Sequence, residues 1–489
     1  MPSHHATDPG THRAGARSNS SVQLKPAIDV RIDGHFTSKV YTSGSTISGQ
    51  AVIHTQRDTP FDRFEIIFTG IAATRLDFVQ QYPSHSFRPF MKLRMPIPRG
   101  TLPESKVFEA GTSYVIPFHF VVPHQLTLGA CTHHCSTPGV REQHLRVPPT
   151  VGFWEADDQA PEMAQIEYSV KARACRETGK IMEGYHMVKV LPAAPEDPPL
   201  DITARDERYN LSKSKTMRKN LFTAKTGKLT ATASQPGAVM LSGDGQNAST
   251  SIARVSLDFA PSSSGTPPPK INSMSGKIMT ATFFGAAPTD LLPNLGSRSA
   301  YTANPSLSYA TTHSLFNLSP DQVTWQERSI STRRDSGYSS LGVDEDASEN
   351  NYARGRDRKR KWAKKCTIRH SAILEVPFSI PLTNLKLFLP TFHSCLISRT
   401  YTLHLNLSVG PTNTTISLAI PLQIGVETVF PSSFDDGLPS FDSAMAEVEV
   451  EEDAAQYHQP RVFRIPDTVQ NNGLLPGYDS LGRRSIGAS

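Results

Sequence analysis

YTLHLNLSV, residues 401–409, decides the fold class of this chain, because apolar and polar side chains alternate along it without a break. Successive side chains of a β-strand point to opposite faces of the sheet, so the apolar residues of this segment share one face. The residues on that face are Tyr401, Leu403, Leu405, Leu407 and Val409. This pattern predicts a strand with one face in a hydrophobic core and the other toward water.

The same alternation recurs in four other segments. Residues 114–122, 166–174, 372–380 and 416–424 each carry apolar side chains at every second position. Burying five such side chains contributes about 8 to 15 kcal/mol before the cost of ordering the chain is subtracted. Because a lone strand cannot bury its apolar face, the segments must form sheets that pack against each other. We find no amphipathic helix longer than three turns, and the sequence therefore predicts an all-β fold.

Composition separates two structured blocks from looser segments. A proline-rich stretch over residues 192–199 follows the first block. The insert in the second block is polar and rich in serine, which favours disorder over a packed structure. The predicted parts are a disordered tail over 1–25, a block over 26–195, a linker over 196–224, a second block over 225–427 with an insert at about 327–358, and a disordered tail over 428–489.

Charge and cysteine content say less about the class of protein. The 50 basic and 45 acidic residues nearly balance, giving a net charge of +5. Five scattered cysteines do not indicate a disulfide framework and fit a reducing compartment. The N-terminal residues lack the apolar segment of a signal peptide, and no run of about 18 apolar residues occurs. We therefore expect a cytoplasmic protein that is not secreted and does not span a membrane.

Several segments resemble the strands of an arrestin fold, in the order that the fold requires. In the first block these are YTSGSTISGQAV (41–52), FEIIFTG (64–70), GTSYVIPFHFVVP (111–123) and IEYSVKARA (166–174). In the second they are GKLTATASQPGAVML (227–241), ARVSLDFAP (253–261), PPKINSMSGKIMTATFF (268–284) and LPTFHSCLISRTYTLHLNLSV (389–409). Gly44 and Gly49 permit a tight turn and a close crossing of strands. The chain is thus similar to the fungal arrestin-like proteins of the alpha-arrestin family.

The resemblance implies two tandem immunoglobulin-like β-sandwiches, an arrestin-like N-terminal one over 26–195 and a C-terminal one over 225–427. It also implies function by binding. Members of this family are trafficking adaptors that bind plasma-membrane transporters or receptors and recruit a HECT-type ubiquitin ligase, whose WW domains bind PY motifs, so that the cargo is ubiquitinated and internalised. We therefore expect an adaptor without enzymatic activity or cofactor, cytoplasmic and peripheral at the plasma membrane or endosomes.

The ligase-recruiting motif is present only in a relaxed form. No PPxY sequence occurs, but Leu475, Pro476 and Tyr478 belong to LPGY in the C-terminal tail. A proline holds such a segment extended and the tyrosine ring fills an apolar groove, whereas the missing first proline weakens binding. We expect this motif to bind the WW domains of the ligase.

A basic run, RGRDRKRKWAKK over residues 354–365, surrounds Trp362. Its basic residues are Arg354, Arg356, Arg358, Lys359, Arg360, Lys361, Lys364 and Lys365. Three interpretations stay open: a solvated loop, a contact with anionic lipid or an acidic cargo tail, and a nuclear-import signal. We expect no nucleic-acid partner.

Serines upstream of the basic run are candidate phosphorylation sites. Ser336 follows Arg333 and Arg334 in a basophilic pattern, and Ser329 and Ser331 precede them. Phosphate there adds nearly two negative charges and would compete with lipid or cargo for the basic run. The alternative is a chance pattern in a serine-rich loop.

The segment CTHHC carries thiol and imidazole groups, the usual ligands of zinc, at Cys131, His133, His134 and Cys135. No second pair of cysteines or histidines follows at the spacing of a zinc finger, so the sequence predicts a polar loop between strands and no metal site. No P-loop, HExxH or GxSxG motif occurs, and catalytic machinery is not recognised.

Two other functions stay open at the level of the sequence. An arrestin-like signalling scaffold would assemble soluble partners without recruiting a ubiquitin ligase. A nuclear regulator would use the basic run over 354–365 as its import signal.

Overall fold

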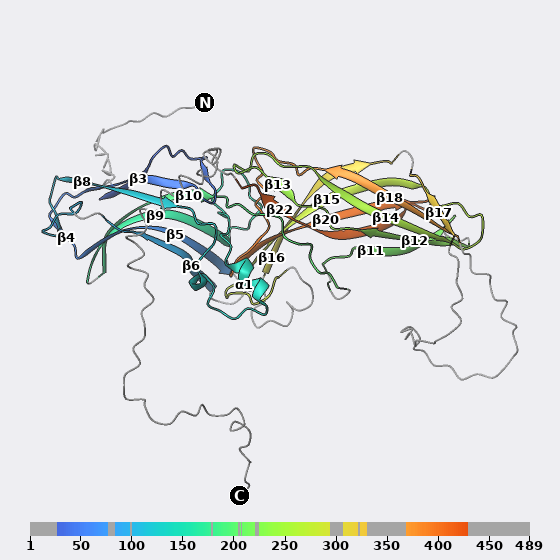
Figure 1. The fold of residues 1–489 in the computed structure, drawn as a ribbon, viewed down its shortest axis with the longest axis horizontal. Coiled ribbons are helices and arrows are strands. Elements are labelled where there is room, and N and C mark those ends of the chain that lie inside the picture. The colour runs from blue at the N-terminus through green and yellow to red at the C-terminus, as the bar shows by residue number, and fades with distance from the viewer. Residues whose placement is uncertain are drawn as a thin grey trace, which may run out of the picture. The chain divides into compact units, whose positions relative to one another are not determined.

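The computed structural model describes residues 27–76, 84–97, 100–177, 179–203, 206, 208–220, 224–293, 307–320, 323–329 and 368–428. Helical structure within these residues is limited to one turn of 3-10 helix, η1 (Leu128–Ala130), and a seven-residue α-helix, α1 (Pro138–His144). The remaining elements are strands (Figure 1), which confirms the predicted all-β class. None of the helices in these ranges is long and apolar enough to cross a membrane.

The strands before residue 191 form two main sheets. One has the order β1-β3-β8, with β1 (Ile28–Ile32), β3 (Thr46–His54) and β8 (Ser113–Val121). The other has the order β2-β10-β9-β5-β6, with β2 (Val40–Tyr41), β10 (Gly179–Val190), β9 (Ala164–Arg176), β5 (Arg63–Leu76) and β6 (Ser84–Met95). A short pair consists of β4 (Thr59–Pro60) and β7 (Val107–Phe108). Neighbouring strands are antiparallel, except that β2 runs parallel to β10.

The strands after residue 211 form a second set of sheets. One has the order β11-β12-β14-β18-β17, with β11 (Ser212–Arg218), β12 (Lys225–Ala233), β14 (Ser251–Pro261), β18 (Ile368–Phe378) and β17 (Gln326–Ser329). Another has the order β16-β15-β20-β19, with β16 (Leu307–Leu318), β15 (Ile271–Phe284), β20 (Ile397–Val409) and β19 (Phe392–His393). A fifth strand of this sheet, β21 (Thr414–Leu422), also pairs with β20. Finally, β13 (Val239–Leu241) and β22 (Ile424–Val426) pair in parallel.

Burial in the structure follows the alternation of the sequence. Every apolar residue of the opening segment, 401–409, is at most 1% exposed, whereas His404, Asn406 and Ser408 between them are half-buried. The strand containing them, β20, lies between β15 and β21, which contribute apolar side chains to the same face of the sheet. The apolar faces predicted within 114–122, 372–380 and 416–424 are also buried, apart from half-buried Tyr114.

The first residues of β20 are buried on both faces, which the alternation does not predict. Ser398, Thr400 and Thr402 are polar but at most 4% exposed. Arg399 is fully buried on the opposite face and donates hydrogen bonds to the Thr282 hydroxyl and to the backbone oxygen of Asp158. Residues distant in the chain therefore cover this end of the strand.

Two strands fall within segments to which the sequence assigns no regular structure. The predicted linker, 196–224, contains β11, which pairs along its length with β12. The predicted insert, at about 327–358, begins inside β17, which pairs with residues 368–371 of β18. Both strands are edge strands of their sheet. An edge strand needs little apolar surface of its own, so composition gives a weak signal for it.

Gly49 lies at the centre of the three-stranded sheet, where two neighbouring strands come close. A Cβ atom added there would meet the Arg31 backbone oxygen at 2.0 Å and the Phe118 ring at 2.8 Å. Gly44, in the preceding turn, has a φ of +82°, a left-handed conformation that favours glycine. The roles predicted for both glycines, a close crossing and a tight turn, are therefore confirmed.

We predict that Gly49→Ala lowers the free energy of unfolding by about 1 to 3 kcal/mol, because the added methyl group must push β1 away from β3. Gly237→Ala is the matched control, since a Cβ atom there meets only the Glu196 carboxylate at 3.7 Å. Urea denaturation of both variants measures the difference. Equal stabilities would contradict the close contact at Gly49.

Glu65 on β5 is a buried carboxylate held by two arginines. Its side chain is 2% exposed; one oxygen accepts a hydrogen bond from the Arg173 Nε, and the other lies 2.9 Å from an Arg94 guanidinium nitrogen. Burial alone would raise the pKa of Glu65, but the hydrogen bond and charge of Arg173, with the charge of Arg94, lower it below its usual value. The ionised form is therefore the one that the fold stabilises.

We predict that Glu65→Gln lowers the free energy of unfolding by about 1.5 to 3 kcal/mol at pH 7, the range for hydrogen bonds to charged groups. The carboxylate stabilises the fold fully above its unfolded pKa, about 4.3, and this contribution is lost as the pH falls through the lowered folded value. The difference between wild type and variant should therefore shrink in acid. Urea denaturation at pH 7 and below pH 4 tests this, and a difference that does not change with pH would refute it.

Candidate metal centre

The segment between β8 and β9 contains η1 and α1. Most of its thiol and imidazole side chains lie within the 14 residues from Cys131 to His144. Helix α1 begins after Thr137, whose side-chain oxygen accepts a hydrogen bond from the Val140 amide at 3.4 Å, and Pro138 occupies its first turn. A threonine cap followed by proline is a strong signal for the start of a helix. The helix places His144 in its last turn, facing back toward the loop that precedes it.

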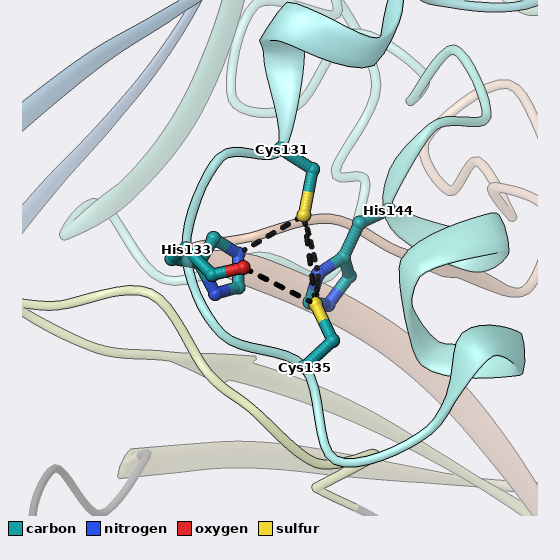
Figure 2. Close-up of side chains that lie close together, drawn as sticks. All are labelled: Cys131, His133, Cys135 and His144. Atoms are coloured by element: carbon teal, nitrogen blue, oxygen red, sulfur yellow. Dashed lines mark hydrogen bonds between the residues drawn. The ribbon is translucent and has the colours of Figure 1, made fainter. Parts of the chain in front are cut away.

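Four side chains of this segment converge on one point (Figure 2). Cys131 Sγ lies 3.6 Å from Cys135 Sγ, 3.3 Å from His133 Nε2 and 3.6 Å from His144 Nδ1. Cys135 Sγ lies 3.7 Å from His144 Nδ1, and all four atoms are within 4.8 Å of one another. Cys131 and His144 are buried, and Cys135 and His133 are half-buried.

These separations are those of a tetrahedron of metal ligands. With zinc at about 2.3 Å from sulfur and about 2.0 Å from nitrogen, ideal tetrahedral angles put two sulfurs ~3.8 Å apart and a sulfur and a nitrogen ~3.5 Å apart. The distances of 3.6 Å for the sulfur pair and 3.3 to 3.7 Å for three of the four sulfur–nitrogen pairs are close to this geometry. The four donors therefore have room for one metal ion between them.

The imidazole of His133 is oriented so that one nitrogen is left for a ligand. Its Nδ1 donates a hydrogen bond to the backbone oxygen of His134 at 2.8 Å, which leaves the lone pair of Nε2 directed at Cys131. Histidines that bind metals usually donate their second nitrogen in this way. For His144 the ligand atom is Nδ1, and its buried Nε2 has no hydrogen-bond partner among the described residues.

The electrostatics of the cluster favour neutral imidazoles. Burial lowers the pKa of His144 to about 3, and it also lowers the pKa of His133. Burial raises the pKa of both thiols, although the nearby Arg141 guanidinium opposes this rise. Both rings therefore offer lone pairs, and a metal ion would have to displace the thiol protons.

The sequence-based interpretation against zinc considered only a second pair of ligands, whereas the structure adds a single histidine to the segment. The interpretation of CTHHC as a polar loop without metal rested on the lack of a second cysteine or histidine pair, but His144 alone completes a four-donor set. His134, the other histidine of the segment, is exposed and not part of the set. Eight residues separate Cys135 from His144 in the sequence, and only the fold of α1 brings these two side chains together. The spacing alone therefore does not indicate the four-donor set.

The segment also contacts loops beside strands of the second set of sheets, after β15 and between β19 and β20. The Ser136 amide donates to the backbone oxygen of Asp290 at 2.9 Å, and the Cys395 thiol lies 3.9 Å from the backbone oxygen of Ala130. The Thr289 amide in turn donates to the Cys395 oxygen at 2.9 Å. The four-donor cluster thus holds a loop that touches residues far along the chain.

The other predicted site residues are almost all outside the described residues. This applies to the relaxed PY motif (Leu475, Pro476 and Tyr478), the basic run over 354–365, and Ser331 and Ser336. Ser329 is the last residue of β17. Their roles stay predictions.

A second polar cluster surrounds Gln159, which is 2% exposed and has a φ of +61°. Its side-chain oxygen accepts hydrogen bonds from the Thr280 and Thr311 hydroxyls, at 2.8 and 3.0 Å, and from His313 Nε2 at 2.9 Å. Its side-chain nitrogen donates to the Leu387 oxygen at 3.2 Å. One amide thus links β15, β16 and a later loop, a role that sequence spacing does not indicate.

A scan against models of protein families finds no match to this sequence, and a search of curated proteins finds no relative.

We predict that Gln159→Ala lowers the free energy of unfolding by about 1 to 3 kcal/mol, because it leaves the buried Thr280 hydroxyl and the half-buried Thr311 hydroxyl without this acceptor. Gln159→Gly should recover about 1 kcal/mol of this loss, since glycine adopts the left-handed backbone without strain. Urea denaturation of the two variants separates the hydrogen bonds from the strain. Wild-type stability in Gln159→Ala would show that the cluster contributes little.

Proposed function

We propose that this protein is a trafficking adaptor of the arrestin type, built from two tandem β-sandwiches, and not an enzyme. In this proposal it binds the cytoplasmic tail of a plasma-membrane transporter or receptor and brings a HECT-type ubiquitin ligase to it through the C-terminal tail. The cargo is then ubiquitinated and internalised. The adaptor acts from the cytoplasm, peripherally at the plasma membrane or endosomes.

The observation that carries the proposal is the position of the eight segments that resemble arrestin strands. Each of these segments overlaps one or two strands of the structure. They divide between a set of sheets before residue 191 and a set after residue 211. A fold does not fix a function by itself, so the ligase step rests on the tail motif.

The sheets also offer a means of binding an extended cargo tail. Strand β16 is 12 residues long and pairs with β15 on one side and with no described strand on the other. All of its side chains are exposed or half-buried. An extended peptide can add to such an edge through backbone hydrogen bonds, while alternate side chains provide selectivity.

The tail motif recruits the ligase by a short peptide contact. Pro476 keeps the segment extended, and the ring of Tyr478 fills the apolar groove of a WW domain. Because the first proline of a full PY motif is replaced by Leu475, the contact is weak and depends strongly on the tyrosine. The basic run over 354–365 would add attraction to an anionic membrane at about 1 kcal/mol per basic residue near the surface.

We predict that Tyr478→Ala abolishes recovery of the full-length chain by the WW domains of a HECT-type ligase. Tyr457→Ala is the matched control, because Tyr457 lies in the same tail without the preceding proline. A pull-down with purified WW domains measures both variants. Unchanged recovery of Tyr478→Ala would remove the ligase from the proposal and favour a signalling scaffold.

A further inference from the structure

We propose that Cys131, His133, Cys135 and His144 bind one Zn²⁺ ion, which fixes the loop over 130–144 and its contacts with Asp290 and Cys395. This inference concerns a metal site and does not depend on the proposed adaptor function. It rests on the geometry of the four donor atoms and on the contacts that the loop makes.

The donor set selects zinc by its chemistry. Two sulfurs and two imidazole nitrogens in a tetrahedral arrangement are typical of zinc, whereas calcium and magnesium prefer oxygen ligands. Two thiolates neutralise the double charge of the ion, so the loaded site is neutral overall. A neutral centre suits a position where Cys131 and His144 are 2% exposed.

Arg141 supports the loaded state from within α1. Its guanidinium donates a hydrogen bond to the backbone oxygen of His133 at 3.4 Å, and its positive charge favours both thiolates. The same hydrogen bond ties the helix to the loop that carries three of the four donors. Arg141 is therefore a positioning residue for the site.

The site is structural in character, because the four side chains fill all four positions of a tetrahedral ion. Catalytic zinc sites keep one position open for water or substrate. The metal acts here by closing the segment upon itself: the loop supplies three ligands and α1 supplies the fourth. Ordering this loop also orders the Ser136 amide, which bonds to Asp290, and the Ala130 oxygen, which lies beside Cys395.

Metal analysis of the purified full-length chain tests the proposal. After gel filtration in buffer with EDTA, elemental analysis by mass spectrometry should find about one zinc ion per chain, and Cys135→Ser and His133→Ala should each hold less than about a tenth of that. His134→Ala and Cys175→Ser are the matched controls, since both residues lie outside the donor set and should leave zinc unchanged.

Hydrogen exchange on the wild-type chain tests the same site without relying on variants that fail to fold. Stripping zinc with a thiol-directed mercurial, followed by reduction, should speed exchange at the Ser136 amide and at the Thr289 amide by about tenfold or more. Adding one equivalent of Zn²⁺, but not Mg²⁺, should restore slow exchange.

Four results would overturn the proposal. They are a wild-type chain that neither retains zinc through the EDTA step nor takes up one equivalent, another metal in its place, equal loss of zinc in His134→Ala, and a Cys131–Cys135 disulfide in the intact purified protein. The first would mean that the loop has no zinc site and that zinc found without EDTA is an adventitious ion only, and the last would mean a redox pair. Zinc binding without any change at Thr289 would confine its effect to the loop and refute the contact with the second set of sheets.

Discussion

Burial of alternate apolar side chains is the constraint on which the rest of this structure depends. In β20 the apolar residues of 401–409 are at most 1% exposed, and the strand has neighbours on both sides. A strand in this position must satisfy its backbone through β15 and β21 and its apolar face through the opposing layer. Once these pairings form, the polar side chains of neighbouring strands and the loops at the strand ends are carried to fixed places, and the polar clusters are built from both.

Polar groups in this protein are buried mainly where they have partners. Glu65 is held by two arginines, and the amide of Gln159 meets donors on β15 and β16. A buried polar group costs free energy unless it is paired, so each such cluster limits how the neighbouring strands can be arranged. The hydrophobic core thus sets the class of fold, while the polar clusters select one arrangement of its strands and loops.

The sequence predicts the class of fold and much of the core, because period-two alternation is a local property. It also predicts the roles of Gly44 and Gly49, since a turn and a close crossing leave a local signal. It misses β11 and β17, because an edge strand needs little apolar surface of its own. It also misses the burial of Arg399, which depends on a hydrogen bond to Asp158, far away in the chain. For the candidate metal centre, CTHHC contains three of the four donors, but the sequence predicts no metal site, because the approach of His144 depends on the path of η1 and α1.

The Gln159 cluster and the four-donor cluster would both fix contacts between the segment before β9 and residues after 270, but by different interactions. Gln159 links the segment before β9 to β15 and β16 by hydrogen bonds, which form whenever the chain folds. Zinc at Cys131 and His144 would instead stabilise the folded chain according to its free concentration, because a ligand that binds only the folded state contributes in proportion to the logarithm of its concentration over its Kd. The contact of the loop with Asp290 would then depend on metal supply and thiol oxidation, while the contact through Gln159 would not.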